Sequence, residues 1–186
     1  MSTPQEDLAY VRAAVDRSMI GNTHPSILYL WALITLTGFC LLDFAPQIGG
    51  LFFAIAAPLG ALVSWIIGYR TARADGQADS REAWAWGLHW AGGIMGGMLL
   101  LSYIIALDIV PASSAGHLML LIVTLSYFFA ALHLDRVMAP VTVLALAALV
   151  ISPRLSTLTW TIPGIAISAG MLFLGVREQR KRAHLS

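Results

Sequence analysis

The sequence contains few charged residues and almost no cysteine. Only 11% of its 186 residues are charged and 58% are hydrophobic, whereas a soluble domain carries about 25% charge. The formal net charge is +1, so the chain has no strong field that would attract nucleic acid. The single Cys40 excludes a disulfide or a thiolate cluster within one chain. Together with a mean hydropathy of +0.77, these shortages predict an integral membrane protein.

The sequence also lacks the short motifs that mark common active sites. It contains no G-x-S-x-G nucleophile elbow, no H-E-x-x-H zinc motif and no P-loop. No acidic or basic side chain lies near the middle of a long apolar segment, which argues against a proton- or sodium-coupled pump. No single depth in the membrane holds enough histidine and acidic residues to supply all the ligands of a zinc site. These absences favour a non-enzymatic protein.

Six apolar segments account for most of the chain. A helix needs about 20 apolar residues to cross a bilayer, and the fifth segment is the shortest, with Pro140 in its first turn. The segments predict an all-α fold, a six-helix membrane bundle that forms one domain over residues 24–176. Their ranges are 26–44, 48–69, 84–107, 116–134, 137–151 and 158–176.

The two ends of the chain have a different character. Residues 3–6 read TPQE, a capping box with proline at the first helical position, and apolar residues then recur at helical spacing. Residues 1–23 are therefore predicted to form an amphipathic helix on the membrane surface, with a solvated tail helix as the alternative. Residues 177–186 are predicted to be a basic tail.

Basic residues set the predicted orientation. Arginine and lysine collect on the side that the positive-inside rule assigns to the cytoplasm, and only Arg154 lies on the other side. This places both termini in the cytoplasm, in a multi-pass protein of the bacterial inner membrane. The preference for arginine over lysine is typical of a GC-rich bacterial genome. The basic residues on the cytoplasmic side are Arg12, Arg17, Arg70, Arg73, Arg81, Arg136, Arg177, Arg180, Lys181 and Arg182.

The six segments group into three helical hairpins of equal length. Each hairpin turns at a proline and reaches an arginine 24 or 25 residues later. Gene duplication is one interpretation, and the fixed thickness of the bilayer is the other. The prolines are Pro46, Pro111 and Pro153, and the arginines are Arg70, Arg136 and Arg177.

The third segment is predicted to be the central packing helix. Between Trp84 and Leu107 it contains no acidic or basic side chain other than His89. Its glycines form two overlapping G-x-x-x-G pairs, and such pairs let helix backbones approach closely in lipid, where there is no hydrophobic drive for association. The predicted packing residues are Gly92, Gly93, Gly96 and Gly97.

Two histidines form a candidate ligand site. His89 and His133 are both placed toward the cytoplasmic side, on helices that are adjacent in sequence. Facing imidazoles could hold a b-type haem as axial ligands, with Arg70 or Arg136 meeting its propionates. The alternative is structural, with His89 bonded to a neighbouring helix and His133 at a helix end.

Two carboxylates lie at the outer helix ends. Asp43 and Asp108 each precede a proline turn, so they form a candidate pair at an outer mouth that would attract a cation. The alternative is that both are interfacial end caps.

Three functions are consistent with these patterns. The leading hypothesis is a non-enzymatic, oligomeric channel or transporter-like bundle, or an accessory subunit of a membrane complex. Its partners would be the lipid bilayer and further membrane chains, with no nucleic acid and no required cofactor. The second hypothesis is a haem-binding, electron-transfer protein. The third is a lipid-modifying membrane enzyme, which rests only on polar residues at helix ends.

Overall fold

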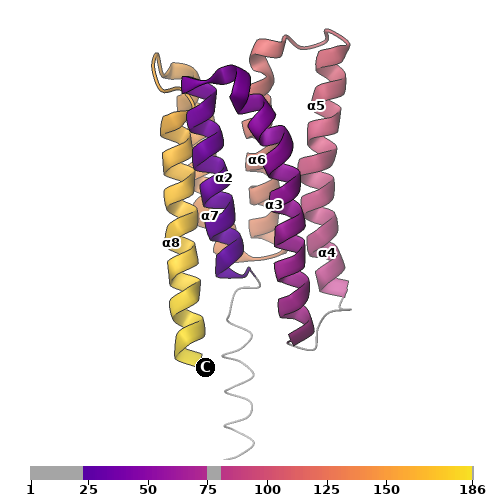
Figure 1. Ribbon diagram of the computed structural model, residues 1–186, viewed down its shortest axis with the longest axis vertical. Helices are drawn as coiled ribbons and strands as arrows, with labels where there is room; N and C mark the ends of the chain where they lie inside the picture. Colours follow the sequence, from indigo (N-terminus) through magenta and orange to yellow (C-terminus); the bar gives the residue numbers. More distant parts are fainter. Residues whose placement is uncertain (1–22, 75–80, 186) are drawn as a thin grey trace, which may run out of the picture.

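The computed structural model describes residues 23–74 and 81–185, and all regular structure within them is helical. The helices run alongside one another in a single bundle (Figure 1), which confirms the predicted all-α, six-helix fold. The predicted helix at residues 1–23 lies outside the described residues, except for Thr23. The elements are α2 (Pro25–Phe44), α3 (Pro46–Ala74), α4 (Arg81–Trp90), the π-helix η1 (Ala91–Gly96), α5 (Gly97–Ala106), α6 (Ala115–His133), α7 (Ala139–Ile151) and α8 (Thr161–Leu185), with short 3-10 turns η2 (Ala112–Ser114), η3 (Arg136–Met138) and η4 (Ser152–Arg154).

Local sequence determines where the first hairpin begins and turns. Pro25 occupies the first turn of α2, where its missing N–H is not needed. The side chain of His24 caps this end by accepting a hydrogen bond from the Ser26 N–H at 3.3 Å. Ala45 leaves the helical conformation before Pro46, as expected for a residue that precedes proline. The remaining segments likewise pair as α4–η1–α5 with α6, and α7 with α8.

Within the described part of the chain, five helical stretches are long and apolar enough to cross a membrane: α2, α3, α4–η1–α5, α6 and the stretch Arg136–Arg154 around α7. The apolar part of α8 ends at Val176, although the helix continues to Leu185. The predicted tail at residues 177–186 is therefore helical as far as Leu185. The three hairpins give the bundle two ends. We call the end where α2 begins and α8 finishes the basic end, and the opposite end the Asp43 end.

Four helices form the core. Buried apolar side chains of α2, α6, α8 and the η3–α7 stretch pack together as one cluster, and α3 and α4–η1–α5 lie outside it (Figure 1). Going around the bundle, α3 contacts α2, α2 contacts α8, α8 contacts α7, α7 contacts α6, and α6 contacts α5. The core residues are Leu28, Ala32, Leu120, Tyr127, Ala130, Met138, Val141, Ala145, Ala148, Ile167, Met171 and Leu174.

The third segment is not the central packing helix, so that prediction is wrong. Only 6% of its apolar stretch is buried, compared with 28% for α2 and for α6. Its main neighbour is α6. The physical reason is that a glycine face needs only one partner helix, and here it meets α6 at the edge of the bundle.

Side chains of neighbouring helices also pack closely on glycines of α8. A Cβ atom added to Gly164 would meet the side chain of Phe39, and one added to Gly175 would overlap the ring of Tyr29, both on α2. A Cβ at Gly170 would overlap Leu144 of α7. Glycine therefore permits tight packing of α8 against both of its neighbours.

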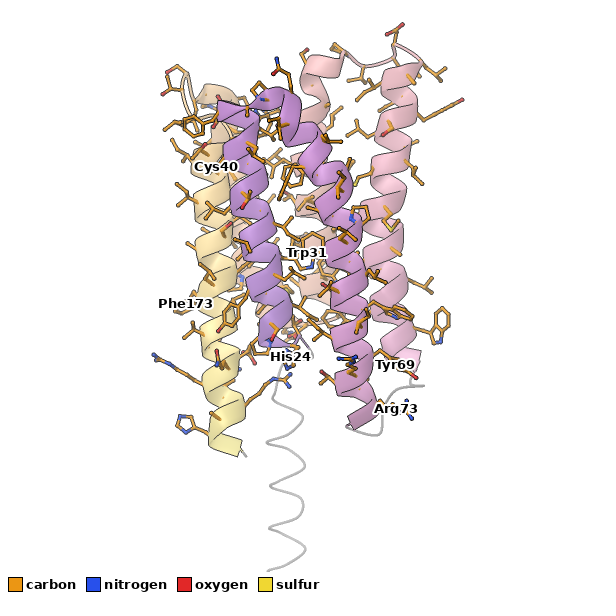
Figure 2. All side chains as sticks on the ribbon, viewed as in Figure 1. His24, Trp31, Cys40, Tyr69, Arg73 and Phe173 are labelled. Carbon is orange, nitrogen blue, oxygen red and sulfur yellow. The ribbon has the colours of Figure 1, made fainter. Side chains whose placement is uncertain are left out.

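A polar contact joins α3 to the core. The indole N–H of Trp31, labelled in Figure 2, donates to Oγ of Ser64 at 3.0 Å. Figure 2 also places His24 and Arg73 at the basic end and Cys40 toward the other end. The α2–α3 hairpin is therefore held by a side-chain hydrogen bond as well as by apolar packing.

Candidate functional site

The four glycines of the third segment divide into two pairs. A Cβ added at Gly93 would lie 2.9 Å from Oγ of Ser126, and one at Gly97 would lie 2.6 Å from a methyl group of Ile122. These two glycines therefore face α6. Gly92 and Gly96 have no atom within 4 Å of the added Cβ. All but Gly97 lie in the π-helix η1. π-Helices are rare in proteins, and those that occur are often found at functional sites.

His89 bonds to the backbone of the neighbouring helix. Its Nε2 lies 2.9 Å from the carbonyl oxygen of Ser126. A carbonyl can only accept, so this nitrogen carries a proton and donates it. The ring also makes an edge contact with Trp90, which in turn packs against Tyr127. His89 thus makes the bond to a neighbouring helix that the structural alternative to a haem ligand predicts.

The geometry does not support a bis-histidine haem site. His133 is exposed and its ring stacks on Phe129. It lies seven residues beyond Ser126 on α6, which is about 10 Å along the helix, so the two imidazoles are at different levels. Arg70 and Arg136, the predicted propionate partners, are exposed at the basic end.

Asp43 caps the last helix. Its Oδ2 accepts hydrogen bonds from the backbone N–H of Thr161 at 2.6 Å and of Trp160 at 3.0 Å. A carboxylate at a helix N-terminus satisfies unpaired N–H groups and interacts favourably with the helix dipole. Asp108 is exposed in the connection between α5 and α6, with a positive φ of 54°. Asp43, in the last turn of α2, is thus engaged by α8, whereas Asp108 lies in the connection between α5 and α6.

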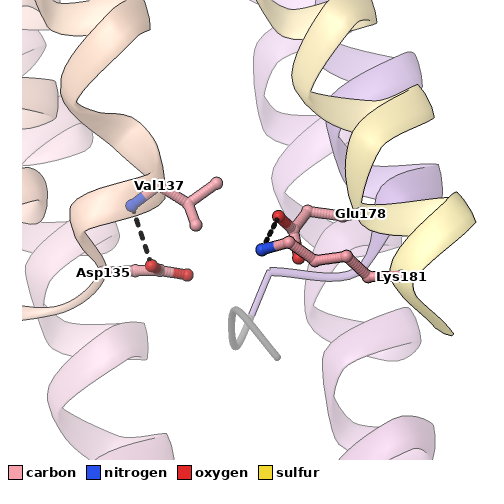
Figure 3. A network of polar contacts seen from close by, with 4 residues as sticks. All are labelled: Asp135, Val137, Glu178 and Lys181. Atoms are coloured by element: carbon pink, nitrogen blue, oxygen red, sulfur yellow. Dashed lines mark hydrogen bonds and ion pairs between the residues drawn. The ribbon is translucent and has the colours of Figure 1, made fainter. Parts of the chain in front are cut away.

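The most unusual polar group is one that sequence reasoning missed. Glu178 of α8 is 0% exposed, and its Oε1 lies 2.9 Å from Nζ of Lys181. Its Oε2 has no hydrogen-bond partner among the described residues. Asp135 accepts the Val137 N–H through Oδ1 at 2.9 Å, whereas its Oδ2 is buried without a hydrogen bond. Figure 3 shows Asp135 and the Glu178–Lys181 pair pointing toward one another between η3 and α8.

Helix register explains why these carboxylates lie at a similar level of the bundle. In antiparallel α7 and α8, Gly170 faces Leu144 and Val141. Glu178 lies eight residues further toward the basic end, about 12 Å along the helix. About the same distance from Val141 and Leu144 toward the basic end, along α7 and η3, leads to Asp135. The two acids therefore come from segments that are remote in sequence and arrive at one level.

The segment before α2 reaches the same level. Tyr29 packs against Gly175, and its hydroxyl donates to Oε1 of Gln179 at 2.7 Å. Because α2 and α8 are antiparallel, Thr23 is level with the turn of α8 that carries Lys181. Thr23 is only 6% exposed, and its hydroxyl has no hydrogen-bond partner among the described residues.

His24 adds a titratable group beside this site. Partial burial, and secondarily the positive charge of Arg182, lower the pKa of His24 below its ordinary value. The neutral ring is also the form whose Nδ1 can accept the Ser26 N–H. The folded state therefore favours the uncharged imidazole.

A sequence signal for Glu178 was present in the spacing of the buried residues. Ile167, Met171, Leu174 and Glu178 follow one another at intervals of four, three and four residues, which is the period of one helix face. The adjacent Arg177 marked the end of the apolar segment and obscured this continuation. The interior position of Glu178 is thus predictable from periodicity but not from hydropathy.

Comparisons with protein-family models, with curated proteins and with solved structures find no match to this chain. The class of protein rests on the fold itself. Five helices with the length and composition of membrane spans, arranged side by side, define a multi-pass helical membrane protein.

Proposed function

We propose that this chain is a non-enzymatic, multi-pass inner-membrane protein that works as an oligomer, as a channel or transporter-like bundle or as an accessory subunit of a larger assembly. The observation that carries the proposal is that two helical elements bury very little of their apolar surface within this chain. Only 11% of the apolar stretch of α3 and 6% of that of α4–η1–α5 is buried. In the series of contacting helices, α3 is the first and α4–η1–α5 is the last. Their exposed apolar surfaces could therefore bind a further chain.

The exposed glycines support the same proposal. Glycine in a helix interior costs about 1 kcal/mol relative to alanine, and in membrane helices close backbone contact offsets that cost. Among the described residues, nothing lies within 4 Å of a Cβ atom added to Gly92 or Gly96. A second copy of the chain, approaching along the third segment, would supply one. An open apolar groove on α3 offers further contact area, lined by Ile48, Leu51, Phe52, Ile55, Ala56 and Leu59.

The experiment is a mass measurement in lipid nanodiscs. We expect wild-type protein to have a multiple of the 20.0 kDa chain mass. Gly92→Leu and Gly96→Leu should shift it toward the monomer by blocking close approach. Gly87→Leu is the matched control, because Gly87 is equally open but lies roughly 140° around the helix from Gly92. A wild-type monomer without any co-purifying membrane chain contradicts the proposal.

The orientation in the membrane belongs to the same proposal. We place the basic end in the cytoplasm, because Arg70, Arg73, Arg136 and Arg180 lie there and positive residues stay on the cytoplasmic side. A fluorescent protein fused after Ser186 should fold and fluoresce, and a periplasmic phosphatase fused there should be inactive. Active phosphatase at this position contradicts the orientation.

A further inference from the structure

We propose that the outward face of α8 at the basic end binds one anionic glycerophospholipid, whose phosphate group is held by Arg177 and Arg180. The proposal starts from an abrupt change along one face of this helix. Phe173 (labelled in Figure 2) and Val176 are exposed and apolar, and the two exposed arginines follow directly. The intervals of three, one and three residues place all four side chains on one helix face. Because a charged side chain is costly in hydrocarbon, the helix leaves the apolar core between Val176 and Arg177, where the lipid headgroups begin.

The buried face of the same helix leaves this outward charge uncompensated. Residues 177–186 contain one acidic side chain, Glu178, which is 0% exposed and paired with Lys181 at 2.9 Å (Figure 3). The acid is therefore used on the inner side of α8. Within residues 23–74 and 81–185, neither Arg177 nor Arg180 forms an ion pair. Both guanidinium groups keep their positive charge at the surface and are available to an external anion.

The chemistry of this face selects a lipid with net negative charge. Arginine binds phosphate oxygens through two parallel N–H donors, and side chains three residues apart on a helix begin about 5–6 Å from each other, so both can reach one phosphate. The acyl chains lie along Phe173 and Val176, which a soluble anion would leave uncovered. A headgroup that carries its own ammonium group would place a positive charge beside the arginines, so a headgroup without one is favoured.

The other exposed arginines at the basic end lack one part of this arrangement. Arg70 and Arg73 of α3 have the same spacing, but two acidic residues, Asp75 and Asp79, follow them closely in the sequence and reduce the local positive charge. Arg136 is the one arginine of the short turn η3, so no second guanidinium group lies beside it on that element. The combination of paired arginines, a sequestered acid and an exposed apolar stretch is specific to α8.

The test is titration of the delipidated full chain in detergent with phosphatidylglycerol or phosphatidylcholine, followed by native mass spectrometry. We expect the wild type to bind phosphatidylglycerol more tightly, since phosphatidylcholine has the same phosphate but no net charge. The double variant Arg177→Gln/Arg180→Gln should lose about tenfold or more in affinity, because each basic residue near anionic lipid contributes roughly a fivefold factor. The matched control is Arg73→Gln/Arg136→Gln, which removes the same charge from the same end but from two different elements. That variant should lose much less affinity.

Three outcomes overturn the proposal. Equal affinity of the wild type for the two lipids would remove the electrostatic argument, and equal losses in the two double variants would reduce the effect to net charge. Displacement of phosphatidylglycerol by an equal concentration of glycerol 3-phosphate would identify the ligand as a soluble anion. If the α8 double variant does not fold, Arg180→Gln compared with Arg73→Gln makes the same distinction. The same spectra count the protein chains, so a monomer that selects phosphatidylglycerol would contradict the assembly proposal and leave this one standing.

Discussion

Substituting Gly175 with alanine tests whether glycine-mediated contact between α2 and α8 holds the core together. A Cβ atom at this position would overlap the ring of Tyr29, whose hydroxyl is fixed to Gln179 by a 2.7 Å hydrogen bond. The ring cannot move away without losing that bond. Overpacking costs about 1–3 kcal/mol and the lost hydrogen bond about 0.5–1.5 kcal/mol, whereas alanine gains about 1 kcal/mol in helix propensity.

The expected net effect of Gly175→Ala is a loss of about 1–3 kcal/mol in the free energy of unfolding. Gly68→Ala is the matched control, because Gly68 is in α3 and no atom lies within 4 Å of its added Cβ. That variant should be neutral or stabilised by up to about 1 kcal/mol. Reversible unfolding in mixed detergent micelles, followed by far-UV circular dichroism, measures the difference.

A double variant separates steric overlap from a general effect of alanine. Adding Tyr29→Ala to Gly175→Ala removes the ring that the new Cβ meets, so the two changes should be non-additive by about 1 kcal/mol or more. If Gly175→Ala is as stable as Gly68→Ala, the α2–α8 contact does not depend on the missing side chain. Strict additivity of the two substitutions would refute the same reasoning.

Three further predictions concern polar side chains. Asp43→Ala should lower the free energy of unfolding by about 1–2 kcal/mol through loss of the α8 cap. Asp108→Asn should have little effect, because Asp108 is exposed and asparagine tolerates its positive φ, and thermal melting of both variants compares them. His89→Phe should cost about 1–3 kcal/mol because the Ser126 carbonyl loses its side-chain donor, and a Soret band in the wild type that disappears in this variant would instead support haem. His24 has a lowered pKa, so the unfolded chain takes up a proton that the folded chain resists, and stability should fall as pH drops through about 6.5. Melting temperatures between pH 7.5 and 5 should show this fall in the wild type and a smaller one in His24→Asn, and equal slopes would exclude His24 as its source.

Much of the fold follows from the sequence because the bilayer restricts what a chain can do. Backbone groups in hydrocarbon must bond internally, so an apolar stretch of sufficient length becomes a helix whatever its neighbours are. The predicted segment 116–134 accordingly matches α6 at Ala115–His133 within one residue. The short fifth segment gains length from the 3-10 turns on either side of α7, which extend its apolar stretch to Arg136–Arg154.

The choice of neighbours is a different matter. The repeated glycine spacing of the third segment predicted a central helix, yet close contacts also involve Gly38 of α2 and Gly164, Gly170 and Gly175 of α8, which follow no such spacing. Whether a glycine packs against another helix depends on which face that helix presents, and this is set by all six helices at once. One-dimensional spacing contains no information about that arrangement.

The sequence alone therefore determined that this protein is helical, that it resides in a membrane and that most of its basic residues share one end. Only the tertiary structure decided that α2, α6, α7 and α8 form the core and that the side chain of Glu178 is buried beside Lys181. The physical reason is that hydropathy and helix period act along one segment, whereas packing and the desolvation of a carboxylate depend on segments that are distant in the chain.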